Sequence, residues 1–214
     1  MASKEREYRT MELRTSEQGE EKSYIVEGYA TTFNDTYELF RDDKYIVMEN
    51  VDKDAFKNTD MSDVVFQIDH EGRVYARTRN KSLSLDIDEH GLKTRTDLSL
   101  TSGSREVFDA IEAGLYDRMS FAFTVTKDSY TKEEKEDGIV ILTRSILEVG
   151  KLYDVSAVSF PANPNTDISA RSKDLIDGEI KRFEAERLHE KELQEKRNAL
   201  LEQISRIKGE QTND

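Results

Sequence analysis

Both prolines of this 214-residue chain, Pro161 and Pro164, lie in one short block, LYDVSAVSFPANPNT (residues 152–166). Proline fixes its own φ, lacks a backbone N–H and restricts the residue before it, so the pair should end the strand that precedes it. Alternating segments rich in β-formers precede the block, whereas Glu, Lys and Arg with scattered apolar residues follow it. The sequence therefore predicts a domain over residues 1–170 and a charged helical or coiled-coil extension over residues 171–214.

The first of these regions is predicted to be mainly β. Period-two alternation indicates an antiparallel, barrel-like core of about seven or more strands, with one or two short helices (α+β). Strands are expected within residues 8–34, 62–70, 82–100, 118–126 and 139–160, with a charged hairpin tip at 127–138. Residues 45–56 are expected to form a short strand that runs into a single helical turn. Helical periodicity over 104–117 places Val107, Phe108, Ile111 and Leu115 on one stripe, with Ser102 or Ser104 as the cap. Gly91 is expected to supply positive φ in a hairpin turn.

Composition excludes several classes of function. A formal net charge of -13 repels phosphate backbones, which argues against direct binding of nucleic acid. The chain has no cysteine, so disulfides, thiol nucleophiles and thiolate metal sites are excluded. No HExxH pattern or phosphate-cradling glycine loop occurs, so neither a metal nor a cofactor is expected. The charged start, MASKEREYRT, does not resemble a signal peptide, and no segment predicts a membrane span.

The chain has three histidines, and one of them is a candidate for chemistry. His90 falls in a predicted hairpin turn and His189 in the charged helix, where both are expected to be solvated. His70 ends an alternating strand that carries Val64, Phe66 and Ile68 on the same face. It is expected at the rim of the sheet, as a catalytic base or as a strand-end histidine bonded to a carbonyl.

A serine and an acidic residue complete a possible site. In RMSFAFTVT, Met119, Phe121 and Phe123 should face the core, leaving Ser120 on an open surface of small side chains. Asp154 interrupts an apolar run, and a buried carboxylate needs a donor such as an imidazole N–H. Glu148 is the reserve choice. A half-exposed strand serine and a water-facing aspartate are the structural alternatives, and spacing alone does not show that these residues meet.

An ordered set of motifs over residues 24–170 resembles the prohead (head maturation) proteases of tailed bacteriophages, serine peptidases related to the herpesvirus assemblins. The set comprises VEGYATTFN, DHEGR, DEHGLKTRTDL, IEAGLYDRMSFAF and LYDVSAVSFPANPNT, of which the last is the most specific. The resemblance implies that the last block carries the third active-site residue, and that its proline-rich turn ends the β core.

Carried over to this chain, the resemblance implies His70 as general base, Ser120 as nucleophile and Asp154 as the acid that orients the histidine. Three departures stand out. The family often has Asn-His-Asp where this chain has Asp69-His70-Glu71, and Gly where it has Ala122. Its third residue is usually Glu, one methylene longer than Asp154. The backbone N–H groups of Ala162 and Asn163 are predicted as oxyanion donors.

The implied function is a serine endopeptidase that cleaves scaffold and capsid-protein segments during procapsid maturation, and also its own termini. Its expected partners are the major capsid protein and the scaffold, and its expected location is inside the procapsid in the host cytoplasm. The alternatives are a catalytically silent scaffolding protein with the same fold and an unrelated β-barrel binding module. The extension is expected either to dock on scaffold and mediate assembly, including self-association, or to act as a solubilising tail.

Overall fold

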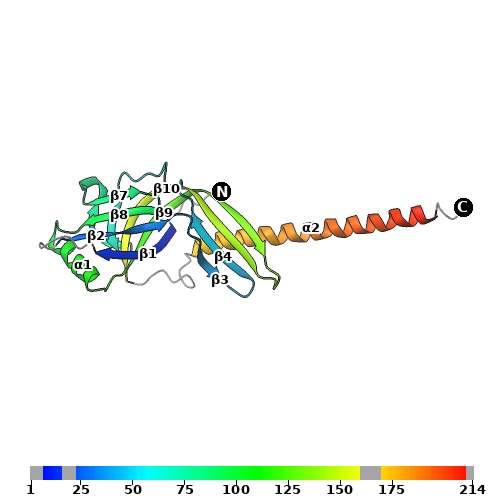
Figure 1. Ribbon diagram of the computed structural model, residues 1–214, viewed down its shortest axis with the longest axis horizontal. Coiled ribbons are helices and arrows are strands. Elements are labelled where there is room, and N and C mark those ends of the chain that lie inside the picture. The colour runs from blue at the N-terminus through cyan, green and yellow to red at the C-terminus, as the bar shows by residue number, and fades with distance from the viewer. Residues whose placement is uncertain (1–6, 16–22, 160–169, 211–214) are drawn as a thin grey trace. The chain divides into compact units, whose positions relative to one another are not determined.

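The computed structural model describes residues 7–15, 23–159 and 170–210. The chain divides into two compact units, Met1–Ser169 and Ala170–Asp214. The first unit contains a large β-sheet and one short helix, and the second contains the single long helix α2 (Ala170–Glu210) (Figure 1). The predicted fold class, mainly β with a C-terminal helix, is confirmed.

One ten-stranded sheet forms the first unit. Its main path runs through β3 (Tyr37–Arg41), β4 (Tyr45–Val51), β10 (Val140–Val158), β9 (Arg118–Glu134), β1 (Glu7–Thr15), β2 (Ile25–Thr32), β8 (Gly91–Asp97) and β7 (Leu83–Ile87). Off this path, β5 (Val65–Ile68) pairs with β10 and with β6 (Glu71–Arg77), and a 3₁₀ turn follows at Thr78–Asn80. Among the described residues β3 and β7 remain separate edges, so the predicted barrel-like closure is not observed.

Two of the strand pairings are parallel. The first part of β10 runs parallel to β4, from Val140 opposite Tyr45 to Ile146 opposite Val51, and its last part runs parallel to β5. The prediction of a wholly antiparallel core is therefore wrong at these two places. Alternation identifies which side chains face the core, but it carries no information on the direction of the neighbouring strand. The 19 residues of β10 are enough to pair with both strands in succession.

β9 and β10 form a hairpin that is longer than the sequence predicts. Residues 127–134, predicted as part of a charged tip, continue β9 and pair with β10 as far as Glu134 opposite Val140. Only residues 135–139 make the turn, in which Gly138 has a φ of 83°. The charged side chains here are mostly exposed, so they do not oppose strand pairing.

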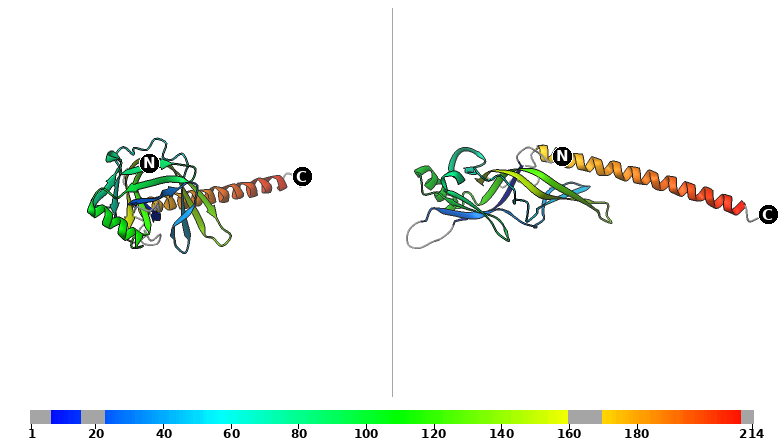
Figure 2. Two further views of the ribbon diagram at one scale, coloured as in Figure 1. Left: turned by 60° about the vertical axis from the view of Figure 1, so that its left-hand side comes forward. Right: turned by 90° about the horizontal axis from the view of Figure 1, so that it is seen from above.

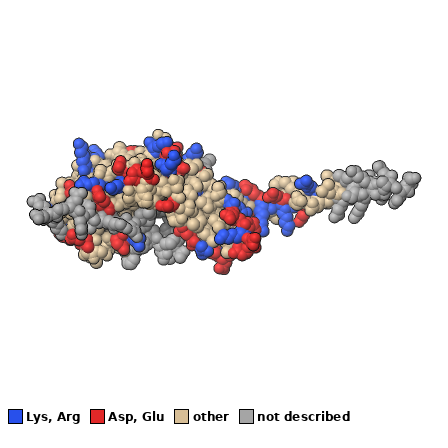
Figure 3. All heavy atoms as spheres, in the orientation of Figure 1, with Lys and Arg blue, Asp and Glu red and all other residues tan. Residues whose placement is uncertain are grey.

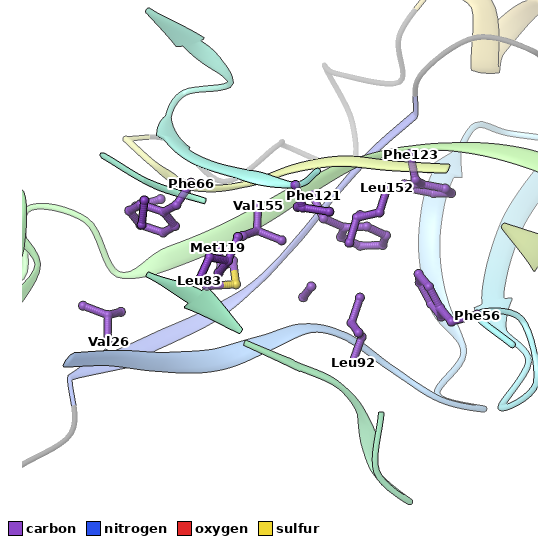
Figure 4. Packing of buried hydrophobic residues seen from close by; sticks show 14 of the residues in the cluster. Val26, Phe56, Phe66, Leu83, Leu92, Met119, Phe121, Phe123, Leu152 and Val155 are labelled. Carbon is purple, nitrogen blue, oxygen red and sulfur yellow. The ribbon is translucent and has the colours of Figure 1, made fainter. Parts of the chain in front are cut away.

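The apolar core lies between two parts of the sheet. Figure 4 shows Phe121, Leu152 and Val155, from β9 and β10, facing Val26 and Leu92, from β2 and β8. As the alternation predicts, the side chains of Met119, Phe121 and Phe123 are all fully buried.

The short helix α1 (Ser102–Glu112) covers part of this core with Val107, Phe108 and Ile111. Leu115 was expected on the same stripe, but it is 69% exposed because the helix ends at Glu112. The N-cap is Thr101, not Ser102 or Ser104: its hydroxyl accepts from the backbone N–H of Ser104 at 3.0 Å. The Ser104 hydroxyl instead donates to the Tyr75 carbonyl, which joins α1 to β6.

Gly91 is required for a different reason from the one predicted. Its φ is not positive; it begins β8 after a turn in which Asp88 accepts from the backbone N–H groups of His90 and Gly91. A Cβ at position 91 would overlap the backbone carbonyl of Thr31 in β2. The glycine therefore permits a close approach of two strands.

A buried ionic cluster joins four strands away from the core. The guanidinium of Arg144 (β10) lies 2.9 Å from Oε1 of Glu7 (β1), 3.2 Å from Glu49 (β4) and 2.8 Å from Asp128 (β9). Burial by itself lowers the pKa of Arg144, but the hydrogen bond to Glu7 and the charges of Glu49 and Glu7 outweigh it and raise the pKa above its ordinary value. Tyr37 also donates to Glu49, at 2.6 Å.

α2 is a continuous helix of 41 residues (Figure 2). Arg182 pairs with Glu179 at 2.9 Å and with Glu186 at 3.4 Å, so local ion pairs of both helical spacings support it. Side chains of both charges occur along it (Figure 3), and four leucines are more than half exposed: Leu188, Leu193, Leu200 and Leu201. Among the described residues, neither helix has the length and apolar character needed to cross a membrane.

Candidate active site

His70 lies in the two-residue turn between β5 and β6. Ile68 pairs with Glu71, and the intervening Asp69 and His70 have φ values of 50° and 61°. Two successive positive φ values are typical of the type I′ turn, which matches the twist of a hairpin. His70 was expected to continue the strand face of Val64, Phe66 and Ile68. The chain turns one residue earlier, and the turn directs the imidazole toward β9 and β10.

Ser120 and Asp154 are brought together by the pairing of β9 with β10. Ser156 lies opposite Ser120, and Asp154 lies opposite Ala122. Residues two apart on a strand share a face, so Ser120, Asp154 and Ser156 all project from the same face of the sheet. On the other side of β10, β5 pairs in parallel and ends next to the turn that carries His70.

The His70 imidazole joins the other two predicted residues. Its Nδ1 lies 2.6 Å from Oδ1 of Asp154, and its Nε2 lies 2.8 Å from Oγ of Ser120. An ionised carboxylate can only accept, so the tautomer that fits both contacts carries its proton on Nδ1. Nε2 can then accept the proton of the Ser120 hydroxyl. This is the hydrogen-bond order of a serine nucleophile, a base and an orienting acid.

The carboxylate of Asp154 has a second donor. The Ser156 hydroxyl, which is fully buried, donates to the same Oδ1 at 2.8 Å. Asp154 is only 2% exposed, and a buried carboxylate is stable only when such donors satisfy it. Ser156 was not singled out from the sequence, although it stands in the YDVS part of the last motif, two residues from Asp154.

The surroundings of Ser120 differ from the prediction. An open surface of small side chains was expected, but Ser120 is 3% exposed, Ala122 is fully buried and Thr124 is 8% exposed. The imidazole of His70, whose side chain is 16% exposed, lies against the hydroxyl of Ser120. Both faces of β9 are therefore buried at this point. Period-two alternation cannot predict the burial of the Ser120 face, because it does not show that His70 lies against it.

The other candidate residues lie elsewhere or outside the described residues. Glu148 is on β10 and accepts from the Thr126 hydroxyl at 3.0 Å, whereas the carboxylate at His70 Nδ1 belongs to Asp154. Ala162 and Asn163, the predicted oxyanion donors, lie outside the described residues.

The two other histidines are exposed, as predicted. His90 packs edge-on against Tyr29 with ring centroids 4.5 Å apart, and His189 lies on α2. No group of three or more His, Asp or Glu side chains in the described ranges is arranged to hold a metal ion.

Comparison with known proteins places these observations in a family. Residues 9–179 match the caudovirus prohead serine protease family. The chain is 31% identical over 161 residues to the prohead protease of Enterobacteria phage HK97, an alignment that covers 75% of this chain and 64% of that protein. The chain thus spans less than two thirds of that relative. No solved structure matches significantly. From the extent of the family match, which includes His70, Ser120 and Asp154, we conclude that the chain belongs to the caudovirus prohead serine proteases.

Proposed function

We propose that this protein is a serine endopeptidase of procapsid maturation, in which His70, Ser120 and Asp154 carry out the reaction. The observation that carries the proposal is the single imidazole that contacts both the Ser120 hydroxyl, at 2.8 Å, and the Asp154 carboxylate, at 2.6 Å. A silent scaffolding protein would have no need of this arrangement, because serine, histidine and aspartate at these distances serve proton transfer rather than packing.

In the proposed reaction, Ser120 Oγ attacks the carbonyl carbon of a peptide bond while its proton passes to Nε2 of His70. Asp154 accepts from Nδ1–H throughout and stabilises the imidazolium that forms. The imidazolium then gives its proton to the departing amine, which breaks the C–N bond and leaves an acyl ester on Ser120. Water, deprotonated by His70, hydrolyses the ester and restores the free hydroxyl. General acid–base transfer of this kind contributes about 10²–10⁴-fold in rate.

The substrates proposed here are the scaffold or scaffolding segment of the major capsid protein, together with the enzyme's own termini. The site of action is the interior of the procapsid in the host cytoplasm. We propose the first unit as the protease domain and α2 as an extension that docks on scaffold. The family relationship supports the choice of substrate class, and the exposed leucines and charges of α2 support a role in association.

Co-expression of this protein with its capsid protein tests the proposal. Ser120→Ala should abolish processing of the capsid protein, because Ala has no hydroxyl to attack the amide. Ser129→Ala is the matched control, since Ser129 lies on the same strand, is exposed, and should leave processing unchanged. Gel mobility and intact mass of the capsid protein give the readout. Normal processing by Ser120→Ala would leave the silent scaffolding protein as the correct assignment.

A further inference from the structure

The turn that carries His70 adopts a backbone conformation that costs free energy. Asp69 and His70 both have positive φ, at 50° and 61°, and neither is glycine. A type I′ turn usually contains Asn-Gly or Gly-Gly, because only glycine adopts this region without steric cost. Asp and His tolerate it better than most residues, yet each still carries a steric cost there. Contacts elsewhere must therefore hold the turn.

Several of those contacts come from the end of β10 and from Ser159, the residue that follows it. The pairing of β5 with β10 stops at Ile68 opposite Ala157, and the next hydrogen bond runs from the Asp69 N–H to the Ala157 carbonyl at 3.0 Å. The Asp69 carboxylate then accepts twice from Ser159: from its backbone N–H at 2.8 Å and from its hydroxyl at 2.7 Å. Hydrogen bonds to a carboxylate are among the stronger ones in proteins.

β10 and the residue after it thus hold His70 at two points. Asp154 binds the ring through Nδ1, and Ser159 binds the side chain of the residue immediately before His70. A hydrogen bond to the ring alone permits the turn to rotate about β5 and to move Nε2 away from Ser120. Fixing Asp69 removes that freedom. A displacement of about 1 Å at a reacting group can cost around 10²-fold in rate.

We infer that Asp69 is a positioning residue: its carboxylate, bound to Ser159, holds the strained turn so that His70 reaches Ser120 and Asp154 at the same time. The inference rests on the proposed function. Asp69 is exposed, and its contacts lie outside the apolar core, so replacing it should not unfold the domain.

Four variants of the full chain separate the effect of the Asp69–Ser159 hydrogen bonds from the effect of backbone strain at Asp69. Asp69→Gly removes the carboxylate and also relieves the steric cost, whereas Asp69→Ala removes the carboxylate and keeps a Cβ at positive φ. Asp69→Asn keeps an acceptor for the Ser159 N–H and is well tolerated at positive φ. Ser159→Ala removes only the hydroxyl bond. Asp137→Gly is the control, because Asp137 is also exposed and accepts from a backbone N–H, that of Ile139.

Two measurements are made on each variant. The first is the rate at which a fluorophosphonate probe labels Ser120, a reaction in which the serine oxygen bonds to phosphorus and fluoride leaves. The second is the low-field proton resonance of His70 Nδ1–H, which reports its hydrogen bond to Asp154. Asp69→Gly and Asp69→Ala should slow labelling by roughly 10- to 100-fold and broaden or remove the resonance. Asp69→Asn and Asp137→Gly should keep both within a few-fold of the parent protein, and Ser159→Ala should fall between.

Unchanged labelling in Asp69→Gly would overturn the inference. It would mean that His70 stays in place without the Asp69–Ser159 hydrogen bonds once the backbone strain is relieved. Slow labelling with an unchanged Nδ1–H resonance would also overturn it, since the effect would not act through the imidazole. Failure of the proposed function is a separate result, because the parent protein itself would then not be labelled at Ser120.

Discussion

Asp154→Asn is expected to lower kcat by about 10⁴-fold while the protein stays folded, the loss typical when the acid of a serine triad becomes an amide. The amide of asparagine can present its NH₂ group to Nδ1 of His70. The imidazole would then carry its proton on Nε2, where it cannot accept the proton of Ser120. The charge that stabilises the imidazolium is lost as well. Initial rates of capsid-protein cleavage by the purified variant give the measurement.

Glu148→Gln is the matched control for this experiment. Glu148 lies on the same strand, six residues before Asp154, but it bonds to Thr126. Its loss should change the rate by no more than a few-fold. A large loss in Glu148→Gln together with near-normal activity in Asp154→Asn would exchange the roles of the two carboxylates and contradict the hydrogen bond at His70 Nδ1.

Arg144→Met is expected to destabilise the domain by about 3–5 kcal/mol, which is the usual cost of removing one partner from a buried ion pair. Arg144 is 2% exposed, and its guanidinium faces carboxylates of β1, β4 and β9. Without it, Glu7, Glu49 and Asp128 would be left close together with no cation between them. Urea denaturation at pH 7 measures the loss, and the midpoint should fall without a change in slope.

Arg95→Met is the control, because Arg95 is half exposed and pairs with Glu27 at the surface. It should cost less than about 1 kcal/mol. A similarly small loss in the free energy of unfolding for Arg144→Met would mean that the buried ionic cluster contributes little to stability.

Much of the fold follows from local pattern. Alternation predicts most of the strands, but not β3 or β6, and helical spacing predicts α1. Alternation also predicts the buried face of Met119, Phe121 and Phe123. The parallel pairings of β10 could not be predicted in this way, since they depend on where residues far apart in the sequence meet. Arg144 was missed for a related reason: a charged residue normally indicates solvent exposure, and three carboxylates from other strands are needed to bury it.

The candidate site shows the same division between local and long-range information. The motifs single out His70, Ser120 and Asp154, and their catalytic roles stay predictions that the distances support. The positive-φ turn at Asp69 and His70 could not be predicted from the sequence, because neither Asp nor His indicates positive φ as glycine does. The burial of Ser120 was also hidden, because the imidazole beside it belongs to a residue 50 positions earlier in the chain. Asp69 and Ser159 become recognisable only once β5 and β10 are paired. Ser156 lies two residues from Asp154 on the same strand, so its contact is local.

The most direct test of the catalytic arrangement is to locate a fluorophosphonate adduct by peptide mass spectrometry in the parent protein, in His70→Ala and in His90→Ala. If the imidazole of His70 activates the hydroxyl, the adduct should lie on Ser120 in the parent protein and in His90→Ala, and it should be absent from His70→Ala. An adduct on another residue, or labelling of Ser120 at the same rate without His70, would contradict the proposed catalytic roles.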